Sequence, residues 1–268
     1  MNPYLKFVKQ VEEGFVSAKK LPLGGIKSCT VETPAADAPK AMLFSPHPDD
    51  ECITGLLPLR LMREAGMQII NVPITFGSKV ERRPSRAAEL KTACDFLGWE
   101  VCGRTGYQNL EKAEGIEILK AVQQAAVFMP HSKDWNSRHI ATHFLVMDIL
   151  SEMPPDFSCT VIETEYWGAM DDPNLMVEGD AKIVADLMAA TSFHIEEVKR
   201  NPYHRSLPAW MQDNVRRGGE LVGGQGSTAP DFTFATLYRL RRWGNGILSD
   251  AVKPGETLAM SDNLKELF

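Results

Sequence analysis

Short apolar segments alternate with longer segments of helical spacing over much of the chain, which predicts an α/β fold. Four apolar segments, and the start of a fifth at Val101, are typical of buried strands: Ala41–Phe44, Gln68–Thr75, Val127–Met129 and Thr160–Thr164. Four other segments repeat apolar side chains on one helix face: Cys52–Ala65, Pro84–Leu97, Glu111–Ala126 and Ser137–Glu152. Because the two kinds alternate as far as about Trp167, we expect a doubly wound, mostly parallel sheet with helices on both faces.

The two ends of the chain follow other patterns. Pro3–Lys19 has the apolar spacing of an amphipathic helix, and a loop rich in Pro, Ala and Gly follows it. Near the other end, Asp180–Val198 has helical spacing, and the piece around Thr233–Arg242 is interpreted as a further helix. The chain shows no internal repeat and no low-complexity linker. We therefore predict a single domain over residues 1–268, with three parts: a helical arm (1–39), a core (about 40–167) and an irregular C-terminal part (168–268).

Composition and charge are those of an ordinary globular protein. Hydrophobic residues make up 44% and charged residues 24%, and a chain of 268 residues can bury a sizeable core without disulfide bonds. The formal net charge of −6 gives no basic field that would indicate nucleic-acid binding. The densest basic stretch, which contains Arg239, Arg241 and Arg242, is interpreted as a solvated helix face.

Targeting and redox signals favour a cytoplasmic location. The first twenty residues lack the continuous apolar segment of a signal peptide, and no stretch approaches the ~20 apolar residues that cross a bilayer. The cysteines are odd in number, irregularly spaced and without a CxxC pair, which favours reduced thiols: Cys29, Cys52, Cys94, Cys102 and Cys159.

A run of ionisable residues, Ser45–Glu51, lies where the first predicted strand ends and a helix begins. Open α/β sheets bind ligands at this position, and buried charged groups are costly unless a cation compensates them. His47 and Asp50 are three residues apart on a turn that Pro48 stiffens, so both can face one divalent ion. Asp49 can point elsewhere, toward a water that such an ion makes more acidic. The alternative is that the two aspartates only cap the following helix.

Three of the six histidines follow the predicted strand Val127–Met129: His131, His139 and His143. In a parallel sheet they lie at the same edge as His47. A zinc site with an open position needs three protein ligands, so this segment is expected to supply one more. His139 and His143 are four residues apart and share a helix face, and the spacing alone does not choose between them.

Several of these segments resemble motifs of the PIG-L/LmbE-like zinc-dependent N-acetylglucosaminyl de-N-acetylase family. Pro46–Glu51 is similar to the family's PHPDDE or AHPDDE signature, and Pro130–His139 is similar to a second motif, Pro-His-Pro-x-Asp-x-His-Pro-Asp-His. Pro84–Gly98 resembles the family's Arg-x-x-Glu helix with its Leu-Gly end, and Glu165–Trp167 resembles a later feature. The resemblance covers about residues 41–167.

This resemblance implies a Rossmann-like hydrolase that removes an acetyl group from an N-acetylglucosamine-type sugar or glycoconjugate. One zinc ion per chain, or another divalent ion, would be held by three residues: His47, Asp50 and His139. Asp49 would be the general base, and Arg86 would bind the substrate. Read from the residues alone, Arg86 can instead form an ion pair with Glu89 on the helix surface.

One position departs from the family pattern. The family has a histidine three residues before its ligand histidine, and this chain has Asn136 there. An amide can donate a hydrogen bond to a developing oxyanion, so Asn136 is a candidate catalytic residue, but it cannot carry a titrating proton. Asp49 would then return the proton to the leaving amine, or His143 would bind the substrate in place of the missing family histidine. Alternatively, Asn136 only caps the helix that begins near Ser137.

Other functions have less support from the sequence. Phosphoester hydrolysis at a metal site usually needs more carboxylates. A glycosidase would need an acid such as Glu163 or Glu165, which we interpret as part of a solvated strand face. The non-enzyme alternative is a sugar-binding or regulatory protein that keeps the fold with little activity. As partners we expect an N-acetylated amino sugar or glycoconjugate, no nucleic acid and no membrane span, and a homo-oligomer is possible.

Overall fold

The computed structural model of the protein describes residues 2–27, 34–122, 125–253 and 255–267, so Cys29 lies outside the described residues. In these residues nine strands form one sheet in the order β3-β2-β1-β4-β5-β7-β6-β9, with β8 paired to β7. The strands are β1 (Lys40–Ser45), β2 (Gln68–Pro73), β3 (Glu100–Val101), β4 (Ala125–Pro130), β5 (Ser158–Thr164), β6 (Leu175–Gly179), β7 (Phe234–Gly244), β8 (Ile247–Asp250) and β9 (Glu256–Leu258).

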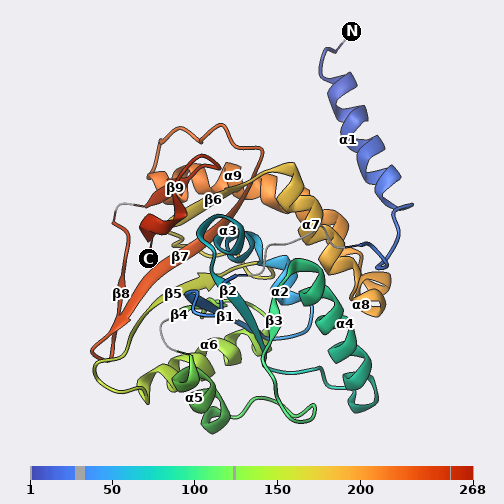
Figure 1. The fold of residues 1–268 in the computed structure, drawn as a ribbon. Helices are drawn as coiled ribbons and strands as arrows, with labels where there is room; N and C mark the ends of the chain where they lie inside the picture. The colour runs from blue at the N-terminus through green and yellow to red at the C-terminus, as the bar shows by residue number, and fades with distance from the viewer. Residues whose placement is uncertain (1, 28–33, 123–124, 254, 268) are drawn as a thin grey trace.

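Strand β1 lies in the middle of the parallel half of the sheet. It pairs in parallel with β2 on one side and β4 on the other, and β3 and β5 extend the parallel pairing outward. The chain builds toward β3 first, then returns to the middle and builds toward β5 (Figure 1). This confirms the predicted α/β fold with a mostly parallel sheet. The strand order reverses between β1 and β4, which is where open α/β sheets bind their ligands.

Helices cover both faces of the sheet. They are α1 (Leu5–Ala18), α2 (Asp50–Ile53), α3 (Leu56–Ala65), α4 (Arg83–Leu97), α5 (Lys112–Ala121), α6 (Ser137–Ser151), α7 (Ala181–Ser192), α8 (Ile195–Arg200) and α9 (Leu207–Gly223), with short 3-10 helices η1 (Val80–Arg82), η2 (Tyr203–Ser206) and η3 (Leu264–Leu267). Neighbouring side chains of a strand point to opposite faces. In β1, Leu43 therefore packs in one core with Leu90 of α4, and Phe44 packs in the other with Val146 of α6.

Two predicted helices end differently in the structure. The prediction over Glu111–Ala126 is wrong at its end, because α5 stops at Ala121 and Ala126 lies in β4 opposite Ala41. Alanine by itself favours a helix, so the pairing with neighbouring strands decides this position. The helical segment predicted over Asp180–Val198 is divided into α7 and α8.

The C-terminal part is more regular than its sequence indicates. The predicted helix over Thr233–Arg242 is wrong, because this segment lies in β7, antiparallel between β5 and β6. The first half of β7 is buried on both faces: Leu237 packs with side chains of α9, and Tyr238 packs in the core that contains Leu43. A strand that is buried on both faces loses the alternation of polar and apolar residues, which hides it from sequence analysis. Helix α9 was not predicted either.

The arginines of β7 do not form a solvated helix face, as the sequence had indicated. Arg239 forms ion pairs with Asp172 and with Asp250, and Arg241 lies 3.8 Å from Glu163. Arginine side chains here connect β7 to neighbouring segments, while Arg242 is exposed.

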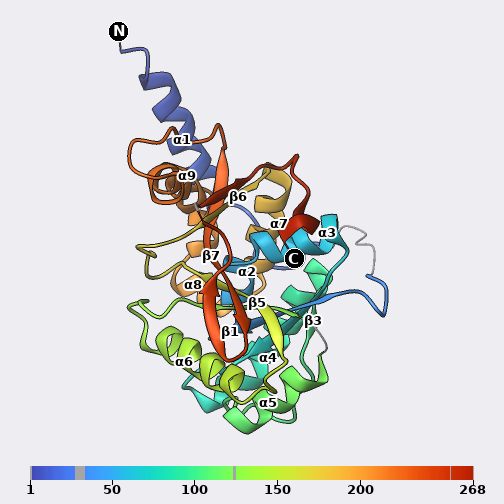
Figure 2. The same cartoon turned by 90° about the vertical axis from the view of Figure 1, so that its left-hand side faces the viewer.

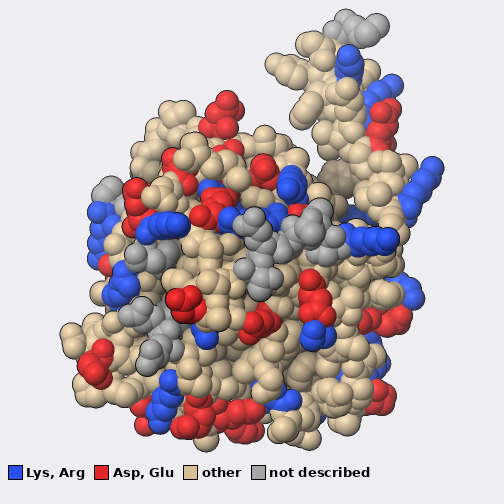
Figure 3. All heavy atoms as spheres, in the orientation of Figure 1, with Lys and Arg blue, Asp and Glu red and all other residues tan. Residues whose placement is uncertain are grey.

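Helix α1 projects away from the body of the molecule in both views (Figures 1 and 2). It confirms the predicted N-terminal helix, and none of its residues is buried. Its exposed apolar side chains are Leu5, Phe7, Val8, Val11, Phe15 and Val16. On the face in Figure 3, acidic and basic side chains are interspersed over the body. No helix in the described ranges has the length and apolar character needed to cross a bilayer.

Candidate active site

The two motif segments meet at the carboxyl ends of β1 and β4. Residues 46–49 follow β1 and lead into α2, and residues 131–136 follow β4 and lead into α6. His47, Asp49, Asp50 and Asn136 line one cleft of about 750 Å³, which also receives side chains from the loop after β2 and from residues 197–203. The site therefore lies at the point where the strand order reverses.

Two imidazoles and one carboxylate converge next to this cleft: His47 and Asp50 line it, and the buried His139 contacts Asp50. The Oδ2 atom of Asp50 lies 3.2 Å from Nδ1 of His47 and 3.3 Å from Nε2 of His139, and candidate ligand atoms of the three residues all lie within 4.8 Å of one another. The buried Nε2 atom of His139 has no hydrogen-bond partner among the described residues. Two imidazole nitrogens and a carboxylate oxygen are a suitable ligand set for a divalent zinc ion.

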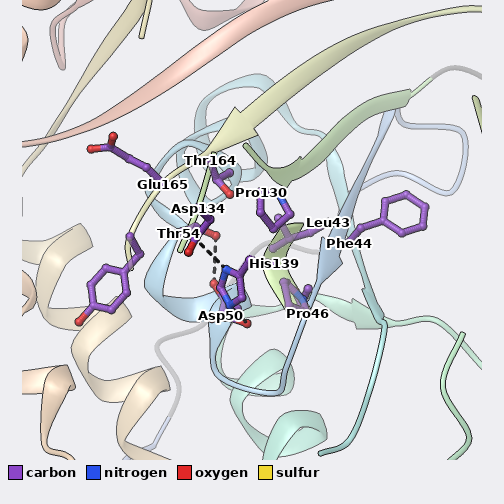
Figure 4. Close-up of a pocket in the computed structure, with 12 residues that line it drawn as sticks. Leu43, Phe44, Pro46, Asp50, Thr54, Pro130, Asp134, His139, Thr164 and Glu165 are labelled. Carbon is purple, nitrogen blue, oxygen red and sulfur yellow. Dashed lines mark hydrogen bonds and ion pairs between the residues drawn. The ribbon is translucent and has the colours of Figure 1, made fainter. Parts of the chain in front are cut away.

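Asp134 is a site residue that sequence analysis missed. Its Oδ2 atom lies 3.4 Å from Nδ1 of His139 (Figure 4). Its Oδ1 atom accepts a hydrogen bond from the backbone of Asn136. A carboxylate on the outer nitrogen of a histidine orients the ring toward a metal. The only sequence signal for this role was the aspartate at the corresponding place of the second motif.

The charges of this cluster favour a cation. Burial lowers the pKa of His139, but the Asp50 and Asp134 carboxylates outweigh that effect and raise it to about 10. Burial likewise raises the pKa of Asp50, yet His139 and His47 bring it well below the usual range. Both shifts have the same cause, which is that the carboxylates favour a positive charge at His139, and a divalent ion would supply such a charge.

Asp49 lies beside this cluster and points to a different set of partners. Its Oδ2 atom accepts a hydrogen bond from the Tyr203 hydroxyl and lies 3.9 Å from a guanidinium nitrogen of Arg86. Its backbone has a φ of 118°, and its N–H donates to the Glu51 carboxylate. Burial, followed by the neighbouring Asp50 charge, raises the pKa of Asp49 to about 7. A carboxyl group with such a pKa can accept and return a proton near neutral pH.

Glu51 connects this turn to the C-terminal part of the chain. Its side chain is fully buried, and Oε1 lies 2.8 Å from Nε2 of His194. Because the other oxygen of Glu51 accepts the Asp49 N–H, the pair Glu51–His194 holds the backbone of the turn in place. His194 precedes α8 and had no assigned role in the sequence.

Asn136 lines the cleft and also caps α6. Its Oδ1 atom accepts a hydrogen bond from the Arg138 backbone N–H at 2.9 Å. The amide oxygen of Asn136 therefore caps the helix, as the alternative from the sequence predicted. The amide nitrogen is not used by this cap. His143 lies elsewhere: its ring is buried, Nδ1 donates to the Pro130 carbonyl at 2.9 Å, and it is not among the residues that line the cleft.

Arg86 is buried and faces Asp49 rather than Glu89. It donates to the Pro48 carbonyl at 3.1 Å, and no ion pair with Glu89 is found in the described ranges. Gly77 lies against it, with a φ of 98°, and a Cβ atom at that position would lie only 2.5 Å from Nη1 of Arg86. The glycine is thus needed for the guanidinium to occupy this position.

Glu163 and Glu165 do not lie on a solvated face, which corrects the interpretation from the sequence. Both are buried. Glu165 forms an ion pair with Arg217 at 2.6 Å and accepts the backbone N–H of Met170. These contacts hold Glu165 in the fold.

Comparison with known families confirms the resemblance stated from the sequence. The family model described as GlcNAc-PI de-N-acetylase, PIG-L, matches residues 42–150, which include both motif segments. Among curated proteins, no match was found.

Solved structures share the fold at low sequence identity. The N,N'-diacetylchitobiose deacetylase from Pyrococcus horikoshii superposes with a TM-score of 0.52 at 14% identity, covering 87% of this chain and 92% of that one. The A40926 pseudoaglycone deacetylase Dbv21 superposes with a TM-score of 0.54 at 12% sequence identity, covering 77% of this chain and 98% of that one. GalB, the 4-carboxy-2-hydroxymuconate hydratase from Pseudomonas putida KT2440, superposes with a TM-score of 0.54 at 15% sequence identity. The match covers 75% of this chain and 95% of that one. Since deacetylases and a hydratase share this fold, its function must be argued from the site.

Proposed function

We propose that this chain is a zinc-dependent hydrolase that removes the acetyl group from an N-acetylglucosamine-type sugar or glycoconjugate. The observation that carries the proposal is the convergence of His47, Asp50 and His139 at a cleft that Asp49 also lines. The match of residues 42–150 to a de-N-acetylase family and the deacetylases among the structures of the same fold support it.

The three converging residues would hold one divalent ion. Zinc bound there would polarise the acetyl carbonyl and make a water more acidic. Asp134 fixes the His139 ring for this purpose, and the indole nitrogen of Trp167, 3.5 Å from Oδ1 of Asp50, lies against the same carboxylate.

Asp49 is the proposed general base. Tyr203 and Arg86 both lie at its Oδ2 atom, so Oδ1 is the oxygen left to accept a proton from the attacking water. The oxygen of that water joins the acetyl carbon, the carbon–nitrogen bond breaks, and Asp49 returns the proton to the leaving amine. Acetate and the free amino sugar are the products. The Asn136 amide nitrogen would donate to the carbonyl oxygen as negative charge develops there.

A screen for acetate release tests this function. Purified protein with added zinc is incubated with a panel of N-acetylated amino sugars, and acetate is measured against an Asp49→Asn sample. We expect release from at least one sugar and almost none from the variant. Sugar binding without acetate release, at full zinc occupancy, would instead favour the sugar-binding alternative.

The proposed location is the cytoplasm. The cysteines that the structure describes, Cys52, Cys94, Cys102 and Cys159, are all free thiols, which supports a reducing compartment.

A further inference from the structure

The cleft concentrates positive charge in a chain whose formal net charge is −6. Six basic side chains line it: Lys79, Arg82, Arg83, Arg86, Arg138 and Arg200. Three carboxylates line it as well: Asp49, Asp50 and Glu197. Since the proposed ion would add two positive charges, the cleft carries an excess of positive charge that the chain as a whole does not.

Half of these basic side chains are already engaged within the protein. Arg82 and Arg200 both form ion pairs with Glu197, with Arg82 at 3.1 Å. Arg86 contacts the Pro48 carbonyl and lies near Asp49, as described above. Arg82 therefore links η1 to α8, Arg200 pairs within α8, and Arg86 contacts the turn that carries Asp49.

Lys79, Arg83 and Arg138 have no carboxylate partner in the described ranges. Arg83 donates only to two backbone carbonyls, those of Gly77 at 2.9 Å and Tyr107 at 3.2 Å, and neither contact neutralises its charge. No side-chain hydrogen bond or ion pair of Lys79 or Arg138 occurs among the described residues. Three unpaired cations facing one cleft would repel one another, which a bound anion would relieve.

The three cations come from two walls of the cleft. Lys79 and Arg83 flank η1 after β2, and Arg138 lies in the first turn of α6, next to the segment that carries Asn136. The cleft also contains the aromatic side chain of Trp135, which is 71% exposed and whose indole nitrogen donates to the Trp167 carbonyl. An exposed, fixed aromatic ring offers a flat apolar surface to a sugar, and the cations offer donors to an attached anion.

We propose that the substrate carries a phosphate monoester, held by Lys79, Arg83 and Arg138, in addition to its N-acetyl group. A phosphate monoester has a charge of about −1.5 to −2 at pH 7 and three acceptor oxygens, which suits several separate cations better than a neutral sugar does. This inference rests on the proposed function for the chemistry at the amide, but the anion site itself is defined by other residues.

Kinetics with matched substrates test the inference. The values of kcat/KM are compared for N-acetylglucosamine and for its 1-phosphate and 6-phosphate. We expect one of the phosphates to be preferred by tenfold or more over the neutral sugar. In the double variant Lys79→Gln/Arg138→Gln this ratio should fall about tenfold, because each removed contact is a charge-assisted hydrogen bond. The matched control is Arg242→Gln, which removes an exposed arginine outside the cleft and should leave the ratio unchanged.

A binding measurement separates this inference from the proposed function. Glucosamine 1-phosphate and 6-phosphate, which lack the acetyl group, are titrated calorimetrically against wild-type protein and the double variant at low and high salt. We expect binding of one isomer that weakens about tenfold in the double variant and weakens with salt. If this holds while no sugar releases acetate, the anion site stands and the amide chemistry fails. If acetate is released but neither phosphate is preferred or bound more tightly than glucosamine, the anion site is overturned.

Discussion

The proposed metal ligands and the side chains that position the catalytic turn come from different regions of the molecule. His47, Asp50 and His139 belong to the parallel half of the sheet, where β1 and β4 end. Tyr203 and His194, which hold Asp49 and Glu51, belong to the C-terminal part around α8 and η2. The comparison teaches that the proposed ligands all come from the first region, whereas Asp49 has contacts from both regions, with Arg86 in the first and Tyr203 in the second.

The largest expected effect is on metal content. In a His47→Ala/His139→Ala double variant two of three ligands are lost, so bound zinc should fall from about one per chain to near zero, measured by elemental analysis. The matched control is His143→Ala, which removes a buried histidine of the same helix outside the cluster and should keep its zinc. Full zinc in the double variant would contradict the assignment of the site.

The next effect concerns the base. Asp49→Asn keeps the shape of the side chain and removes its basicity, so kcat should fall by about 10²–10⁴-fold with zinc retained. Zinc and kcat are measured on the same sample. Loss of zinc together with activity would show that Asp49 is itself a ligand.

Asn136→Ala tests a donor within the first region. If the amide nitrogen faces the developing oxyanion, kcat should fall about a hundredfold with little change in zinc. Loss of the cap to Arg138 should also cost about 1 kcal/mol of unfolding free energy. A lowered melting temperature with normal kcat would leave only the capping role and would strengthen the sugar-binding alternative. Asn136→His should be tolerated.

Tyr203→Phe tests the second region and should have the smallest effect on rate. The variant removes only the hydroxyl that donates to Asp49, so kcat should fall about tenfold, with zinc unchanged. That hydrogen bond lowers the pKa of Asp49, so its removal raises this pKa. The base is then deprotonated only at higher pH, and the acidic limb of the pH–rate profile should move upward. An unchanged profile would mean that the C-terminal part does not orient the base.

The parallel half of the fold and the convergence of His47, Asp50 and His139 could be predicted because their signals are local. Ala41–Phe44 is a short apolar run before a polar turn, and both motifs directly follow strands. Spacing alone left the choice between His139 and His143 open, and the resemblance to the family motif favoured His139. In the structure only His139 reaches Asp50, while His143 contacts the Pro130 carbonyl.

The remainder could not be predicted because it depends on contacts distant in sequence. The first half of β7 is buried on both faces, and its sequence resembled a helix until its two neighbouring strands were known. Glu165 is polar and was expected in solvent, but its partner Arg217 lies 52 residues further along the chain. Tyr203 lies 154 residues from Asp49, and no spacing rule connects them.

The positive φ angle of Asp49 implies a trade-off between the stability of the fold and catalytic activity. At a φ of 118° a side chain strains the backbone by about 1–3 kcal/mol, whereas glycine adopts such angles freely. Asp49→Gly should therefore melt at a higher temperature than Asp49→Ala while both are inactive, a difference that thermal unfolding can measure. Glycine would relieve this strain but has no carboxylate, so the proposed general base at this position would come at the expense of stability.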